Sequence, residues 1–121
     1  MILGLRTAAY PTPDLAAGKA WYSKVFEREP YFDEPFYVGF SIGGFELGLV
    51  PDGEPGTAGV QAMWGVDDIN AEVKRIVGLG GVLHEGPQDV GGGILVASIR
   101  DPFGNLLGLI YNPHFKREDV R

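Results

Sequence analysis

The sequence predicts an α+β fold made of two tandem βαβββ units within one domain. The chain has 121 residues, which suits a single compact domain. Strand-like and helix-like segments follow in the order strand, helix and three strands, and this order occurs twice. A shift of 54 residues superposes Asp14-Leu15 on Asp68-Ile69, and a shift of 62 aligns the last strands of the two halves. We therefore expect one domain over residues 1–121, with units at about 1–54 and 55–121.

The first unit begins with a strand over residues 3–10. Thr12 is the predicted N-cap of the helix that follows, Pro13 takes its first position, and Asp14 lies near the positive end of its dipole. Apolar residues at helical spacing continue this helix to about Phe26. Turns at 33–35 and 43–44 separate the three short strands that complete the unit, which we expect over residues 29–32, 36–42 and 45–50.

The second unit repeats this order after a loop over residues 51–59 that is rich in proline and glycine. Asp67-Asp68 opens its helix, and the glycines within 78–81 close it. Gly91–Gly93 predicts a flexible hairpin tip and not a phosphate cradle, because no helix start follows it. A turn at 101–105 precedes the last of the expected strands, which cover residues 60–66, 82–84, 94–99 and 106–111.

Composition and charge exclude several classes of function. Sixteen Asp and Glu against ten Lys and Arg give a formal net charge of −6, so the chain repels phosphate backbones and nucleic acid is excluded as a partner. The chain has no cysteine, which excludes disulfides, thiolate metal sites and cysteine nucleophiles. No apolar run approaches the roughly 20 residues of a membrane span, and the N-terminus lacks a basic leader. We therefore expect no membrane partner and a cytoplasmic location.

Two stretches of the sequence carry a family resemblance. The segment TAAYPTPDLAAGKAWYSKVF opens the first half, while V-D-D-I, Gly80-Gly81 and DPFGNLLGLI follow in the second. Together they resemble the vicinal oxygen chelate superfamily, which includes glyoxalase I, extradiol dioxygenases, fosfomycin-resistance proteins and bleomycin-resistance binding proteins. The resemblance covers about residues 3 to 112 and implies a single glyoxalase/bleomycin-resistance-like domain, in which two βαβββ units form a curved mixed sheet with the helices outside it.

The resemblance also implies where a divalent metal would bind. Metal-dependent members hold the ion with four side chains of the β-cup, and the matching positions here are Thr7, Glu46, Gln61 and Gly108. Glycine offers no ligand atom and a neutral threonine hydroxyl is a poor ligand for Zn, Ni or Fe(II). One carboxylate and one amide are too few donors for a labile ion. We therefore expect a degenerate site with no metal cofactor.

Period-two alternation predicts which residues line the cup. If Gln61 faces inward, so does Met63, and Ile110 accompanies Gly108. The predicted ligand-binding set is Thr7, Glu46, Gln61, Met63, Gly108 and Ile110. Glu46 is also the candidate catalytic residue, as a general base, although it would serve equally as the partner of a ligand cation. Because an unpartnered polar group is costly in an apolar cavity, Glu46 and Gln61 should bond each other or await a ligand.

Aromatic residues give two further expectations. Trp21-Tyr22, near the end of the first helix, should pack that helix against the sheet. Five aromatics cluster on the strands that wall one side of the cup, and alternation sends about half of them inward, where they would stack on a planar ligand or fill the core. They are Tyr31, Phe32, Phe36, Tyr37 and Phe40.

Three functions compete at this point. The favoured one is a metal-free protein that binds a small organic molecule in the β-cup, for which the acidic charge and the aromatic strands suit a cationic, planar ligand. The alternative is a metal-dependent lyase, isomerase or dioxygenase of the glyoxalase or extradiol type. A purely structural dimer module is the third. In each case we expect a homodimer, because the open strand edges of each unit need a partner and small relatives pair as symmetric dimers.

Overall fold

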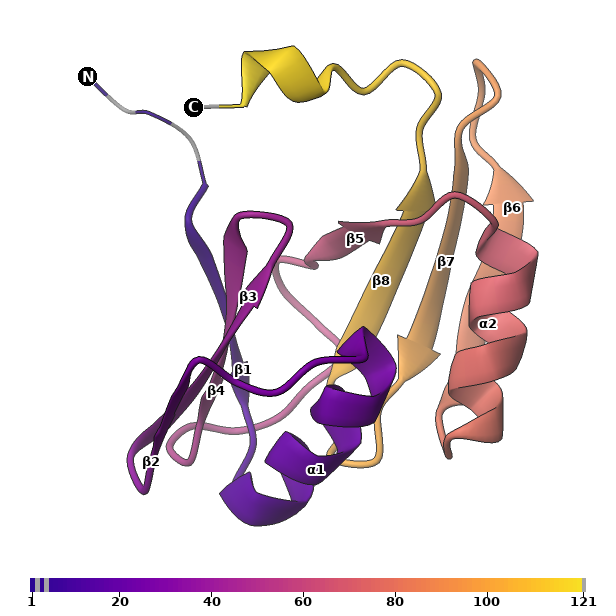
Figure 1. The fold of residues 1–121 in the computed structure, drawn as a ribbon. Coiled ribbons are helices and arrows are strands. Elements are labelled where there is room, and N and C mark those ends of the chain that lie inside the picture. The colour runs from indigo at the N-terminus through magenta and orange to yellow at the C-terminus, as the bar shows by residue number, and fades with distance from the viewer. Residues whose placement is uncertain (2, 4, 121) are drawn as a thin grey trace.

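The computed structural model describes Met1, Leu3 and residues 5–120, and within them the chain forms two βαβββ units (Figure 1). The first unit contains β1 (Thr7–Pro11), α1 (Leu15–Phe26), β2 (Phe32–Glu34), β3 (Tyr37–Ile42) and β4 (Phe45–Val50). The second contains β5 (Met63–Gly65), α2 (Ile69–Gly78), β6 (Val82–Asp89), β7 (Leu95–Arg100) and β8 (Leu106–Tyr111). A 3₁₀ turn over Arg117–Asp119 follows.

Each unit forms a mixed sheet, and the two sheets share one topology. The strand orders are β1-β4-β3-β2 and β5-β8-β7-β6. The first strand of each unit pairs in parallel with the last, while the remaining neighbours are antiparallel. Helix α1 packs on β3 and β4, and α2 packs on β6, β7 and β8. The predicted α+β fold of two βαβββ units is thus confirmed, with the curved sheet divided into two four-stranded sheets.

The two helices begin in the same way. Asp14 caps α1 by accepting a hydrogen bond of 3.1 Å from the Ala17 amide, and Asp68 caps α2 through an equal bond from Ala71. Asp14, not Thr12, is therefore the N-cap of α1, and the prediction for Thr12 was wrong. Thr12 is fully buried, and its hydroxyl donates to the Tyr10 carbonyl instead.

Several strand boundaries differ from those expected. Strand β2 lies at Phe32–Glu34, so Asp33 and Glu34 pair with β3 where a turn was predicted. Strand β1 begins at Thr7 instead of residue 3, residue 4 lying outside the described residues; β5 is shorter than predicted, and β6 continues to Asp89 instead of ending at residue 84. Gly86 and Pro87 interrupt the alternation of β6, because both residues are uncommon inside strands. Strand β8 has the predicted bounds.

A buried polar network joins the two units. The Tyr22 hydroxyl of α1 donates to the Asp101 carboxylate over 2.6 Å, and the other oxygen of Asp101 accepts from the Phe103 and Asn105 amides. The Asn105 side chain in turn donates to the carbonyl of Pro11. Burial and the neighbouring Asp101 carboxylate raise the pKa of Tyr22 well above its ordinary value. The network therefore locks the turn before β8 onto the first unit.

The apolar core surrounds this network. Tyr22, Phe40, Leu47, Ile76 and Ile99 are almost entirely buried. The expectation that Trp21-Tyr22 packs α1 is confirmed for both residues, and the Trp21 indole also donates to the Leu79 carbonyl over 2.9 Å. None of the helices in the described residues has the length and apolar character that a membrane crossing requires.

Candidate functional site

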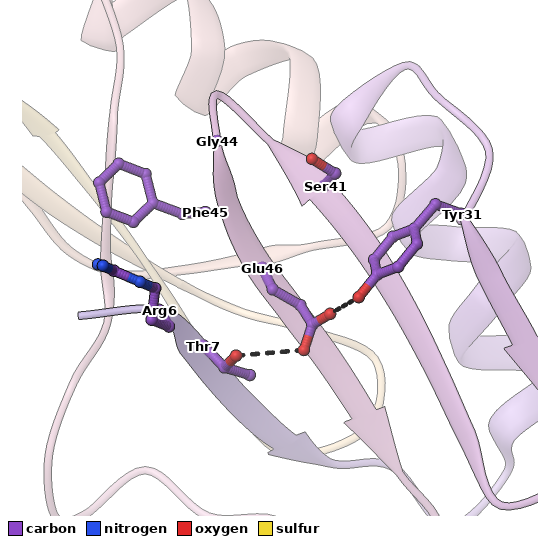
Figure 2. A pocket seen from close by; sticks show the side chains of 7 residues that line it. All are labelled: Arg6, Thr7, Tyr31, Ser41, Gly44, Phe45 and Glu46. Atoms are coloured by element: carbon purple, nitrogen blue, oxygen red, sulfur yellow. Dashed lines mark hydrogen bonds between the residues drawn. The ribbon is translucent and has the colours of Figure 1, made fainter. Parts of the chain in front are cut away.

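The most developed polar cluster surrounds Glu46 on β4. Its carboxylate accepts hydrogen bonds from Thr7 on β1 over 3.2 Å, from Tyr37 on β3 over 2.5 Å, and from Tyr31 in the segment before β2. Figure 2 shows the side chains of Tyr31 and Thr7 converging on this carboxylate. Three hydroxyl groups from separate segments therefore fix one carboxylate.

Sheet register and two glycines make this convergence possible. Thr7 lies directly opposite Glu46 in the parallel β1–β4 pair. The next residues on the same face of β3 and β4 are Gly39 and Gly48. A Cβ atom on Gly48 would come within 2.1 Å of the Tyr37 hydroxyl, and one on Gly39 within 3.2 Å of both tyrosine rings. The missing side chains thus leave room for the rings to lie across the sheet.

A cavity of about 350 Å³ adjoins the cluster. This volume falls at the lower end of the range for small-molecule sites. Figure 2 shows Arg6 near Phe45, with its guanidinium directed away from Glu46. Arg6 directly precedes β1 and contributes to this lining. The full lining is Arg6, Thr7, Tyr31, Ser41, Gly44, Phe45 and Glu46.

The aromatic cluster divides between site and core. Tyr31 and Tyr37 reach Glu46, whereas Phe40 is fully buried in the core. Burial raises the pKa of Tyr37, so its hydroxyl remains a proton donor at neutral pH. Tyr31 as a residue is 64% exposed, which leaves ring surface available to a ligand. The position of Tyr37 two residues before Gly39, on the same strand face, is the sequence signal that would identify it as a residue of this site.

Gln61 and Met63 lie in a different place. They line a second, smaller cavity of about 50 Å³ on the other sheet, which shares no lining residue with the first. The sequence predicted that Glu46 and Gln61 would either bond each other or await a ligand. Within the chain they do not bond each other, because Glu46 accepts from the three hydroxyls instead. The reason is that the curved sheet implied by the family resemblance is divided here into two separate sheets.

Gly108 occupies the centre of the second sheet. It lies opposite Met63 in the parallel β5–β8 pair, as Glu46 lies opposite Thr7 in the first sheet. A Cβ atom on Gly108 would come within 2.5 Å of the Ala62 carbonyl. Ile110 pairs with Gly65 and lines neither cavity. The ligand-binding roles of this predicted set stay predictions.

The four positions that the resemblance assigns to a metal do not fit a divalent ion. Within one chain, Thr7 and Glu46 adjoin each other and Gln61 lines the other cavity, while Gly108 has no ligand atom in any arrangement. The lone pairs of the Glu46 carboxylate are largely taken by hydroxyl donors. Among the residues that the structure describes, no group of three or more His, Cys, Asp and Glu is placed to hold a metal.

Comparisons with known proteins identify a family for this chain. A family model described as the Glyoxalase/Bleomycin resistance protein/Dioxygenase superfamily matches residues 4–109. No curated protein matches the sequence.

Solved structures resemble the chain in fold at low identity. A fosfomycin resistance protein, FosX, from Listeria monocytogenes, solved with Mn(II) and sulfate, is 18% identical with a TM-score of 0.77, and the match covers 99% of this chain and 96% of that one. A lactoylglutathione lyase from Agrobacterium tumefaciens is 21% identical with a TM-score of 0.73, covering 93% and 97%. A glyoxalase-related enzyme from Fulvimarina pelagi is 20% identical with a TM-score of 0.74, covering 93% and 90%.

Proposed function

We propose that this chain, which belongs to the Glyoxalase/Bleomycin resistance protein/Dioxygenase superfamily, binds a small organic molecule without a metal cofactor. The ligand carries a cationic or N–H donor group that bonds to Glu46, next to a planar part. The observation that supports this most is the set of three hydroxyls on the Glu46 carboxylate. Those hydroxyls take the place that a metal would need at the carboxylate oxygens.

The remaining acceptor capacity of Glu46 favours one N–H donor. A carboxylate offers about four lone-pair sites, and three hydroxyl donors leave about one of them for a ligand. A charged N–H group gives the stronger bond to a carboxylate. The exposed face of Tyr31 adds a surface on which a planar cation can lie, and the net charge of −6 attracts cations from solution.

We also propose that the chain acts as a homodimer. Both sheets have open edges at their outer strands, and the Glu46 and Gln61 cavities lie on separate sheets. A second copy that pairs its Gln61 sheet with the Glu46 sheet of the first would close a cup at two equivalent sites. Light scattering is then expected to give twice the chain mass of 13.1 kDa, and a monomer mass across micromolar concentrations would contradict the dimer.

The alternative function is a metal-dependent lyase, isomerase or dioxygenase of the glyoxalase or extradiol type. Two similar structures favour keeping it, because one is described as a lactoylglutathione lyase and another was solved with Mn(II). In this alternative Glu46 would be the general base. The metal ion of such an enzyme would need ligands other than the four residues that the resemblance assigns.

Benzamidine, a planar aromatic cation, is a suitable probe for separating the two functions. We expect metal-free purified protein that binds benzamidine, with affinity reduced about tenfold in Glu46→Gln and Glu46→Ala, because a charged hydrogen bond contributes about 1.5 kcal/mol. Glu54→Gln, a neutralised carboxylate in an exposed loop, is the matched control and should bind normally. Addition of a chelator should leave the affinity for benzamidine unchanged. Stoichiometric Zn, Ni or Fe that is lost on chelation together with binding would support the alternative.

A further inference from the structure

The two oxygens of the Glu46 carboxylate are engaged differently. Oε2 accepts hydrogen bonds from Thr7 over 3.2 Å and from Tyr37 over 2.5 Å, whereas Oε1 accepts from Tyr31. Figure 2 shows Thr7 and Tyr31 approaching the carboxylate from opposite sides, each bonding to its own oxygen. Because each carboxylate oxygen offers about two lone-pair sites, Oε2 is filled and Oε1 retains about one. A ligand of Glu46 therefore bonds to Oε1.

The three hydroxyl donors also differ in how they are held. Thr7 and Tyr37 belong to the strands on either side of β4, and the half-buried Tyr37 places its hydroxyl over Gly48. Tyr31 lies in the segment between α1 and β2 and is 64% exposed. Exposed side chains change rotamer within nanoseconds. The Tyr31 hydroxyl is thus the donor that can leave the carboxylate without any movement of a strand.

The backbone around Tyr31 is fixed to the sheet even though its side chain is exposed. The Tyr31 amide donates to the Gly39 carbonyl over 3.0 Å. Arg28, three residues earlier, donates to the Ser41 carbonyl over 2.7 Å. Both bonds attach the segment to β3. A change of the Tyr31 rotamer therefore opens Oε1 while the residue stays at the wall of the cavity that it lines.

We propose that the Tyr31 hydroxyl is an exchangeable gate on Oε1 of Glu46, and that the ligand which displaces it is a cation of the amidine or guanidine type. This inference rests on the proposed function, in which a cationic N–H group bonds to Glu46. Amidinium and guanidinium groups direct two N–H bonds to the same side. Both can reach one oxygen only when both of its lone-pair sites are open. The exchange replaces one neutral hydroxyl by two charged N–H donors, so it gains a hydrogen bond and an ion pair.

Two aromatic cations of similar size test the gate by calorimetric titration. Benzamidine carries two N–H bonds side by side, whereas protonated N,N-dimethylbenzylamine carries a single one. In Tyr31→Phe, which keeps the ring and removes the hydroxyl, we expect benzamidine to bind about fivefold tighter, because Oε1 no longer has to be vacated. The affinity for dimethylbenzylammonium should change by less than about twofold, since its one N–H uses the lone-pair site that is open in both proteins.

Two further Tyr→Phe variants are matched controls. Tyr111→Phe removes a hydroxyl from the end of β8, in the other sheet, and should leave both affinities unchanged. Tyr37→Phe removes a donor from Oε2, but the ring over Gly48 still covers that side of the carboxylate, so benzamidine should not bind more tightly. Tyr31→Phe differs from the natural chain by one oxygen atom of an exposed residue, so the variant is expected to fold normally.

Failure of the gate and failure of the proposed function give different results. Benzamidine binding that is unchanged or weaker in Tyr31→Phe would overturn the gate and leave the Glu46 site intact. An equal gain for dimethylbenzylammonium, or an equal gain for benzamidine in Tyr37→Phe, would do the same. A natural chain that binds neither cation, or Glu46→Gln protein that binds benzamidine as tightly as the natural chain, would overturn the proposed function and the gate with it.

Discussion

The two sheets of this protein share one topology but differ at their central strands. Glu46 on β4 and Gly108 on β8 occupy matching positions, each opposite the first strand of its own unit. In the first sheet a carboxylate binds three hydroxyls; in the second, the Ala62 carbonyl and the Met63 side chain occupy the space beside the glycine. The two units of the duplicated fold therefore have the same strand pairing, while the residue at the matching central position determines which polar groups the sheet face presents.

The turns before β4 and β8 differ as well. The first is a tight Gly43-Gly44 turn with positive φ at both residues, a geometry that suits a two-residue hairpin. The second is longer, and it carries Asp101 and Asn105 into contact with Tyr22 and Pro11 of the first unit. Only the second turn therefore also holds the two units together.

The largest expected effect comes from breaking that junction. Asp101→Ala removes the acceptor for the Tyr22 hydroxyl and for two backbone amides, so we expect the free energy of unfolding to fall by about 3 kcal/mol. Urea unfolding measures this change. Asp52→Ala, in an exposed loop, is the control and should have almost no effect. A loss below about 1 kcal/mol for Asp101→Ala would show that the network does not join the units energetically.

An intermediate effect is expected at the two glycines beside the sites. Gly108→Ala directs a methyl group at the Ala62 backbone carbonyl, which cannot move without distorting β5, and should cost about 2 kcal/mol. Gly48→Ala meets the end of the Tyr37 side chain, which can move only by giving up its hydrogen bond to Glu46, and should cost about 1 kcal/mol. Thermal unfolding of both variants gives the comparison. The opposite ranking would mean that the Tyr37 ring is held more rigidly than the β5 backbone.

The smallest effect should be equal in the two units. Asp14→Ala and Asp68→Ala each remove one N-cap bond of 3.1 Å, and each should cost about 1 kcal/mol. Asp67→Ala, adjacent to the second cap but exposed, is the control. Chemical denaturation of the single variants and of the double variant tests this, since distant sites should be additive within about 0.5 kcal/mol. Clearly unequal losses would show that the caps are not equivalent.

The sequence by itself determined the repeat and the order of the elements, whereas the family resemblance placed Thr7 and Glu46 in one site. Those features depend on short-range signals such as capping residues, turn residues and alternation, which act within a few positions. Even so, Thr12 was mistaken for a cap because its burial against Gly18 depends on the packing of α1 on the sheet.

Only the tertiary structure decided which groups satisfy Glu46 and which cavity contains Gln61. Tyr31 reaches Glu46 across Gly39, from a segment outside any strand, so alternation gives no signal for it. Gly86 and Pro87 indicate an irregularity in β6, but the register shift itself, which decides the face of the side chains beyond it, is set by the pairing with β7. The division into two sheets likewise depends on strand pairing between segments far apart in the sequence, which no single stretch of the chain encodes.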